Sequence, residues 1–195
     1  MELANAINKR RTIRRFKQTP VTPEQINTLI ESALMAPSAK NGQLLRFIAV
    51  SSPEKLREVF RNTAWGGYVH PKRIPLTDVS SPMLFIVISA LKNDDGEISH
   101  HTWADSGAAI QNMLLSAVEL GLGSCWIGSF DPEIMKTVVG LPDNQFPLYV
   151  VAFGEPDETP QMERIGSDGS TRYYLDQEDT LHVPKYTVEA VTTYL

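Results

Sequence analysis

Basic residues are concentrated in one short segment near the N-terminus. Six of the eighteen lysines and arginines fall within nine positions: Lys9, Arg10, Arg11, Arg14, Arg15 and Lys17. The default interpretation of such a run is a solvated basic face. The alternative is an anion site for one small phosphorylated ligand, because the forked guanidinium of arginine suits a phosphate and Thr12 adds a hydroxyl. Composition alone favours the solvated face.

A second candidate segment is polar and follows a proline. Ser38, Asn41, Gly42 and Gln43 come directly after Pro37 and supply amides and a hydroxyl. Such groups can hydrogen-bond the edge of a heterocycle. An ordinary surface turn has the same composition, and without further information it is the better interpretation.

The third candidate segment combines small residues with a glycine-rich turn. Residues 105–112 place Gly107, Ala108 and Ala109 on a predicted helix, and residues 121–128 hold three glycines. The glycines lack the spacing and the strand–turn–helix setting of a dinucleotide fingerprint. Asp105 is predicted to start the helix and to stabilise its terminus, so we expect a structural role for it.

Charge and cysteine content exclude several classes of protein. The formal net charge of −5 argues against nucleic acid as the main partner. The single cysteine, Cys125, allows no intrachain disulfide and favours a reducing compartment. The adjacent pair His100 and His101 has no third ligand at a zinc-like spacing, so no metal site is predicted. With no signal peptide and no membrane-length apolar run, we expect a cytoplasmic protein that binds no membrane.

The elements that must position these segments follow from hydrophobic spacing. Helices are predicted near residues 2–9, 23–36, 53–61, 102–120 and 131–139. Strands are predicted near residues 47–50, 84–90, 124–127 and 148–153. Helices and strands do not alternate strictly, which predicts an α+β fold with a sheet covered by helices. The length fits a single domain over 1–195, whose polar tail from about residue 155 packs on a partner or a cofactor.

Taken together, three segments resemble the nitroreductase family of flavin mononucleotide (FMN) enzymes. They are residues 10–16 (RRTIRRF), residues 36–43 (APSAKNGQ), and residues 105–112 (DSGAAIQN) running into 121–130 (GLGSCWIGSF). The resemblance implies a nitroreductase-like fold with a central mixed or antiparallel sheet, in an intertwined homodimer with two flavins at its interface. With this resemblance, a binding site for the FMN phosphate becomes the better interpretation of the basic segment, in place of a solvated basic face.

The resemblance also implies a set of cofactor-binding residues. Arg10, Arg11, Thr12 and Arg14 are implied to bind FMN, with Arg14 near the pyrimidine edge of the flavin. Residues from the loop are implied to contact the flavin bound mainly by the other subunit, and these are Pro37, Ser38, Ala39, Asn41 and Gln43. The family usually continues Pro-Trp after the glutamine, whereas Leu44 and Leu45 stand here.

Two further parts of the site are implied by the same resemblance. Ile127, Gly128 and Ser129 belong to the segment that faces flavin N5. Lys185 matches part of a terminal Pro-Lys-Arg segment, but Tyr186 replaces the usual arginine. Either Lys185 or Arg164 therefore completes the phosphate site.

The resemblance implies an FMN-dependent oxidoreductase that takes electrons from NADH or NADPH. A nitroaromatic or quinone-like acceptor would then receive them in a ping-pong reaction. No catalytic residue from the chain is expected, because the cofactor carries the chemistry. Two alternatives stay open: an FMN storage or sensor protein, and a related flavoenzyme for dehalogenation or dehydrogenation. Residues 65–78 are a candidate substrate lid, where Lys72 and Arg73 meet either a 2′-phosphate or solvent.

Overall fold

A four-stranded antiparallel sheet forms the centre of the computed structural model, which describes residues 2–195. Its strands are β1 (Leu45–Val50), β2 (Leu84–Leu91), β3 (Gly123–Ile127) and β4 (Gln145–Gly154), in the order β1-β2-β4-β3. Strands β2 and β4 lie inside the sheet and consist mostly of apolar residues. Such runs are typical of strands covered on both faces.

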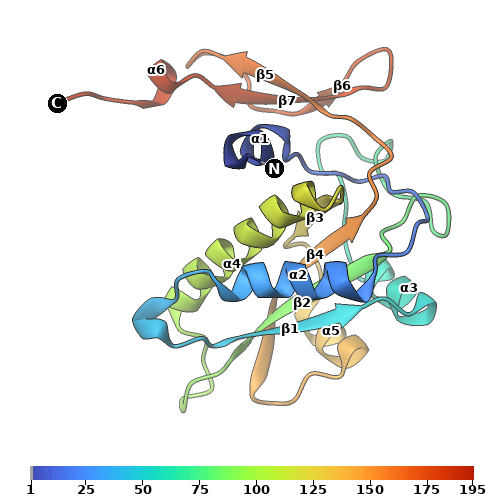
Figure 1. The fold of residues 1–195 in the computed structure, drawn as a ribbon, viewed down its shortest axis with the longest axis vertical. Coiled ribbons are helices and arrows are strands. Elements are labelled where there is room, and N and C mark those ends of the chain that lie inside the picture. Colours follow the sequence, from blue (N-terminus) through green and yellow to red (C-terminus); the bar gives the residue numbers. More distant parts are fainter. Residues whose placement is uncertain (1) are drawn as a thin grey trace.

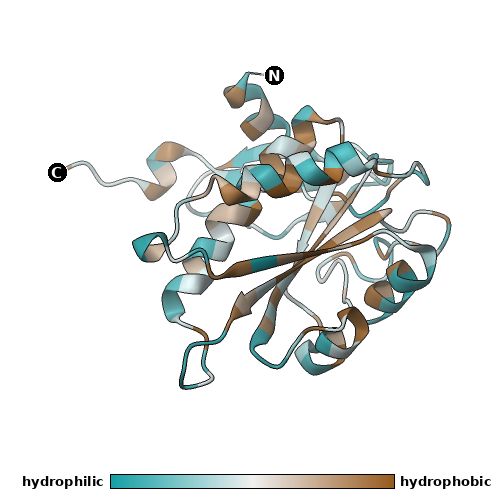
Figure 2. Ribbon diagram, turned by 60° about the horizontal axis from the view of Figure 1, so that its bottom comes forward, coloured by the Kyte–Doolittle hydropathy of each residue, from teal (hydrophilic) through white to brown (hydrophobic). Residues whose placement is uncertain are grey.

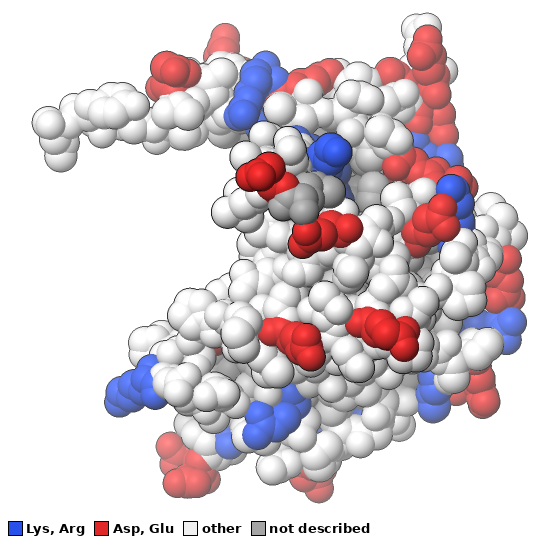
Figure 3. Space-filling model, in the orientation of Figure 1, with Lys and Arg blue, Asp and Glu red and all other residues white. Residues whose placement is uncertain are grey.

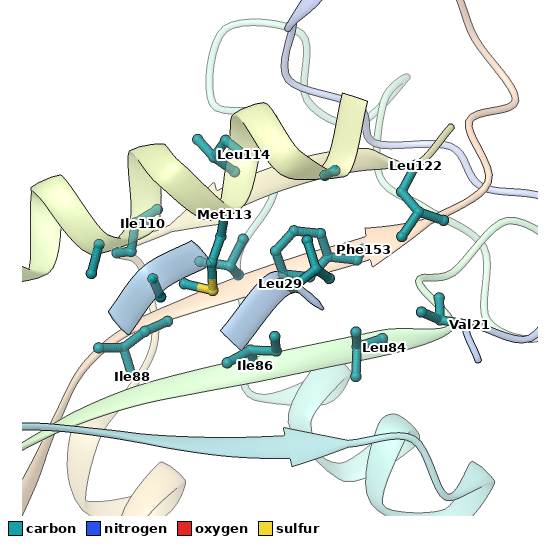
Figure 4. Packing of buried hydrophobic residues seen from close by; sticks show 14 residues of the cluster. Val21, Leu29, Leu84, Ile86, Ile88, Ile110, Met113, Leu114, Leu122 and Phe153 are labelled. Atoms are coloured by element: carbon teal, nitrogen blue, oxygen red, sulfur yellow. The ribbon is translucent and has the colours of Figure 1, made fainter. Parts of the chain in front are cut away.

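Helices cover both faces of the sheet (Figure 1). On one face lie α2 (Pro23–Leu34) and α4 (His100–Glu119), and on the other lie α3 (Pro53–Arg61) and α5 (Pro132–Val139). Successive strand residues point to opposite faces. Accordingly, Leu84, Ile86 and Ile88 of β2 pack toward α2 and α4 (Figure 4), whereas Phe85 and Val87 pack toward α3 and α5. Figure 2 shows hydrophobic residues along the strands and mixed character on the helices.

Local signals in the sequence fix several helix ends. Thr22 and Gln25 form the capping box of α2, and the Asp131 carboxylate accepts hydrogen bonds from the first turn of α5. Gly140 ends α5 with φ of 67°, a left-handed conformation that glycine adopts without strain. Helix α4 begins at His100, not at Thr102 as predicted. Asp105 therefore lies inside the helix, and the prediction that it starts the helix was wrong.

A second, three-stranded sheet follows the main one in the sequence. It comprises β5 (Gln161–Ile165), β6 (Tyr174–Leu175) and β7 (Leu181–Tyr186), in the order β5-β7-β6. Helix α1 (Leu3–Lys9) lies between this sheet and the main body (Figure 1). The sequence showed no clear period here, because these strands are short and fully bury only Leu181 and Pro184.

The chain ends in a projecting arm. Helix α6 (Val188–Val191) and the last residues extend away from the rest of the molecule (Figures 1 and 3). The loop between α2 and β1 contains the short 3-10 helix η1 (Ala39–Asn41). No helix within residues 2–195 is long and apolar enough to cross a membrane.

Candidate functional site

The basic segment lies along the free edge of β3. The Ile13 amide donates a hydrogen bond of 2.9 Å to the Ser124 carbonyl, and Phe16 is fully buried. Glycine permits this close approach: a Cβ atom on Gly123 would lie 2.7 Å from Ile13, and one on Gly154 would lie 3.0 Å from Phe16. Two buried anchors therefore hold the segment against the sheet.

The side chains of the basic segment divide into paired and unpaired cations. Arg15 forms an ion pair of 2.9 Å with Asp179, and Lys17 forms one of 2.6 Å with Glu155. Within residues 2–195, neither Arg10 nor Arg11 pairs with a carboxylate; Arg11 donates to the Arg10 carbonyl. Partly buried cations without a carboxylate partner favour an anionic ligand.

Electrostatics around these two arginines support an anion site. Burial lowers the pKa of Arg10. Burial also lowers the pKa of Arg11, with further contributions from the nearby guanidiniums of Arg10 and Arg164. The structure thus brings Arg10, Arg11 and Arg164 together, and Lys185 lies opposite Arg164 in the β5–β7 register. An anion bound between these positive charges would offset their mutual repulsion.

Arg14 has a different environment. Its backbone amide donates to the Glu158 carboxylate, and its guanidinium lies over the Tyr173 ring, 5.0 Å from the ring centroid. The guanidinium makes no hydrogen bond or ion pair with any other residue in 2–195. Its donors are therefore available for a ligand.

The predicted N5-facing segment continues from the end of β3. Ile127 is buried, and a Cβ on Gly128 would contact the Tyr149 ring at 3.6 Å. The Ser129 carbonyl accepts a hydrogen bond of 2.9 Å from Ala64. Residues 127–129 thus lie between the main sheet and the start of the 65–78 loop.

Exposed aromatic residues border this segment. Trp126 and Trp103 are 39% and 40% exposed, and each contacts Tyr149 edge to face. The sequence analysis missed this group, because its members are scattered over α4, β3 and β4.

The polar loop is held by α4. The Ala39 amide donates to the Asp105 carboxylate at 3.1 Å, which gives Asp105 its structural role. Lys40, Asn41 and Gln43 all have positive φ, an unusual concentration of strained backbone in non-glycine residues. Pro37, Ser38 and Gln43 line a hollow of about 110 Å³ together with Asp105.

This loop lies apart from the basic segment within one chain. In Figure 1 the loop after α2 lies on the left, while the segment after α1 runs along the right side. No hydrogen bond in residues 2–195 joins the loop to residues 10–14 or 127–129. One chain therefore presents two separate parts of the predicted site.

A buried cation, Arg73, holds loop 65–78 against the C-terminal tail. Arg73 is only 2% exposed, and its guanidinium lies 3.4 Å from the Glu158 carboxylate and 3.3 Å from Asp179. The expectation that Arg73 meets a 2′-phosphate or solvent was therefore wrong. Glu158 also accepts the Arg14 and Arg15 amides, so one tail carboxylate joins this loop to the basic segment. Sequence analysis missed Glu158, which lies in the polar tail.

The family model described as nitroreductase family matches residues 7–155. The chain belongs to the nitroreductase family. The matched range contains the basic segment, the polar loop and residues 127–129. Family membership confirms the predicted α+β nitroreductase-like fold.

Individual relatives of the chain agree with the family assignment. It is 30% identical to the NADPH-flavin oxidoreductase of Vibrio harveyi, over 78% of this chain and 65% of that protein. It is 27% identical to the FMN reductase (NADPH) of Bacillus subtilis, over 94% of this chain and 79% of that protein. The solved structure of an FMN-dependent nitroreductase from Clostridium difficile superposes with a TM-score of 0.64, at 28% identity, over 80% of this chain and 88% of the other.

Proposed function

We propose that this nitroreductase-family protein is an FMN-dependent oxidoreductase that uses NADH or NADPH. Nitroaromatics, quinones or similar planar acceptors are the second substrates. One observation carries the proposal: Arg10 and Arg11 lie partly buried on the free edge of β3, and neither pairs with a carboxylate among residues 2–195. The names of the flavin-using relatives support the same cofactor.

The residues present fit the parts of FMN. Arg10, Arg11 and Thr12 would hold the phosphate, with Lys185 or Arg164 as the additional base. The Arg14 guanidinium, with its unused donors, would meet the pyrimidine edge. Ile127, Gly128 and Ser129 would line the ring near N5. When bound, FMN supplies two-electron chemistry, so the chain needs to bind and orient rather than to provide an acid or base.

We also propose that the active enzyme is a homodimer in the cytoplasm. The separation of the polar loop from the basic segment supports this, because the loop would then act on the flavin of the other subunit. Its residues in that role are Pro37, Ser38, Ala39, Asn41 and Gln43. The projecting apolar arm provides a means to hold a second copy.

An anaerobic absorbance titration tests the function. Purified protein is reconstituted with FMN and titrated with NADH and, separately, with NADPH. Bleaching of the flavin band near ~450 nm, followed by recovery on adding a nitroaromatic or a quinone, is the expected result. Bound flavin that neither donor bleaches would favour the storage or sensor alternative, and failure to bind FMN would overturn the proposal.

A further inference from the structure

Four side chains form a continuous stack beside the proposed flavin site. The Arg14 guanidinium lies 5.0 Å from the Tyr173 ring centroid, and the Tyr173 ring lies 4.9 Å from that of Tyr68. On the outer side, the Arg172 guanidinium lies 4.9 Å from the Tyr68 ring. We call these four residues the Arg14–Arg172 stack. Two neighbouring tyrosine rings, tilted by 58° to each other, are flanked by a cation at each end, and each cation is attracted to the electron-rich face of its tyrosine.

The stack joins three segments that are far apart in the sequence. Arg14 belongs to the basic segment, Tyr68 to loop 65–78, and Tyr173 and Arg172 to the C-terminal tail. The Tyr173 hydroxyl accepts a hydrogen bond of 3.3 Å from the Tyr68 amide, so the tail holds the loop backbone as well as its ring. The same loop begins beside Ser129, through the Ala64 hydrogen bond described above. The stack therefore reaches the proposed site at Arg14, and it holds loop 65–78, which begins beside Ser129.

We propose that Tyr173 is a positioning residue, whose ring sets the direction of the Arg14 guanidinium and keeps loop 65–78 closed. This inference rests on the proposed function, because Arg14 would act at the pyrimidine edge of FMN. Reduction adds negative charge to that edge, and a fixed cation beside it favours the reduced cofactor. Among residues 2–195, the Arg14 guanidinium makes no hydrogen bond or ion pair, and the Tyr173 ring lies against it.

Tyr173→Leu provides the main test. In the reconstituted protein we expect the equilibrium between oxidised and reduced bound FMN to shift about threefold to tenfold toward the oxidised form. For a two-electron couple, tenfold corresponds to about 30 mV, which equilibration with a reference dye resolves. In the FMN-free protein we expect amide hydrogen exchange in residues 65–74 to become several-fold faster, since the loop loses one of its attachments to the tail and keeps that of Arg73.

Matched variants separate positioning from general damage. Tyr173→Phe keeps the ring, so the flavin equilibrium should stay at the wild-type value while the Tyr68 amide exchanges faster. Tyr68→Leu, at a position 57% exposed, should loosen the loop with a smaller shift in the equilibrium. Leu76→Ala changes an exposed side chain of the same loop outside the stack and should change neither measurement.

Each outcome bears on a different claim. A wild-type flavin equilibrium and wild-type loop exchange in both leucine variants would overturn the inference and leave the proposed function standing. If the wild-type protein itself binds no FMN, the proposed function fails, while loop exchange still decides whether Tyr173 closes the loop.

Discussion

At the scale of single residues, neighbouring cations of one basic segment have different roles. Arg15 and Lys17 are neutralised by carboxylates from the tail and stabilise local structure. Arg10 and Arg11 have no such partner among residues 2–195, and burial lowers the pKa of both. The cations that the fold leaves without a carboxylate partner therefore indicate where an anionic ligand binds, and the number of basic residues does not.

This difference predicts that substituting Arg10 lowers the affinity for FMN and that substituting Lys17 does not. Arg10→Gln should weaken FMN binding by roughly tenfold or more, because a hydrogen bond to a charged group contributes about 1.5–3 kcal/mol. The measurement is quenching of flavin fluorescence during titration. Lys17→Gln removes a paired, exposed cation and serves as the control. Equal affinities for the two variants would contradict the placement of the phosphate at Arg10.

Cys125 should be unreactive in the folded protein. The thiol is buried at 5% exposure, and burial raises its pKa to about 11. The thiolate, which is the reactive form, is therefore scarce at pH 8. A chromogenic disulfide reagent should detect no thiol in the native protein and one after denaturation. Rapid native labelling would show that β3 opens readily.

At the scale of elements, the contact between β3 and the basic segment depends on Gly123. A Cβ there would lie 2.7–2.9 Å from three atoms of the branched Ile13 side chain, close to the backbone where little movement is possible. Gly123→Ala should therefore lower the free energy of unfolding by about 1–3 kcal/mol and weaken FMN binding.

Chemical denaturation and flavin titration on the same preparation provide the check. Gly107→Ala is the matched control, because its Cβ would meet Trp126 at an ordinary 3.7 Å. If Gly123→Ala were as stable as the wild type, the segment would not be pressed against β3 as described.

The C-terminal sheet should lose stability as the pH rises. His182 lies between two carboxylates, 2.8 Å from Asp176 and 2.6 Å from Glu163, and its ring stacks on Tyr174. The hydrogen bond to Asp176, followed by that to Glu163, raises the pKa of His182. The stabilisation is therefore complete below the unfolded pKa of about 6.5 and is lost as the pH rises through the folded value.

Amide hydrogen exchange in β5, β6 and β7, corrected for its intrinsic pH dependence, measures this effect. Protection should fall as the pH rises above about 6.5 in the wild-type protein. In His182→Gln, protection should not depend on pH over this range. The same decline in both proteins would assign the effect to another group.

Prediction from the sequence succeeded where local signals agree with packing. Pro23 after the Thr22 cap predicts the start of α2, and the apolar run rich in branched residues at 84–90 predicts the buried strand β2. The C-terminal sheet was missed because its strands are short and bury few of their residues completely. The Glu158 and Tyr173 contacts join residues more than a hundred positions apart, and no local pattern encodes such a pairing. Family resemblance supplied the candidate site residues, and whether they bind FMN stays a prediction.

At the scale of the whole molecule, one chain keeps the two parts of the predicted site apart. The basic segment and residues 127–129 lie near β3, whereas the polar loop lies at the far end of α2. The arm of residues 188–195 stands clear of the body and exposes Val188, Val191 and Tyr194 by 58%, 66% and 82%. Apolar side chains on a projecting segment are typical of a surface that another chain covers.

Removing residues 188–195 should therefore impair both assembly and cofactor binding. The cut follows Thr187, whose amide bonds to the Ile165 carbonyl, so β7 keeps its pairing with β5. We expect the dimer dissociation constant to rise at least tenfold, which corresponds to about 1.4 kcal/mol. FMN affinity should fall in parallel and become dependent on protein concentration, because the polar loop would come from the other subunit. Sedimentation and flavin titration at matched concentrations measure the two effects.

A full-length control with Thr192→Ser and Thr193→Ser keeps the apolar side chains and should assemble normally. A truncated protein that remains dimeric and binds FMN as tightly as the full chain would show that the arm does not hold the partner.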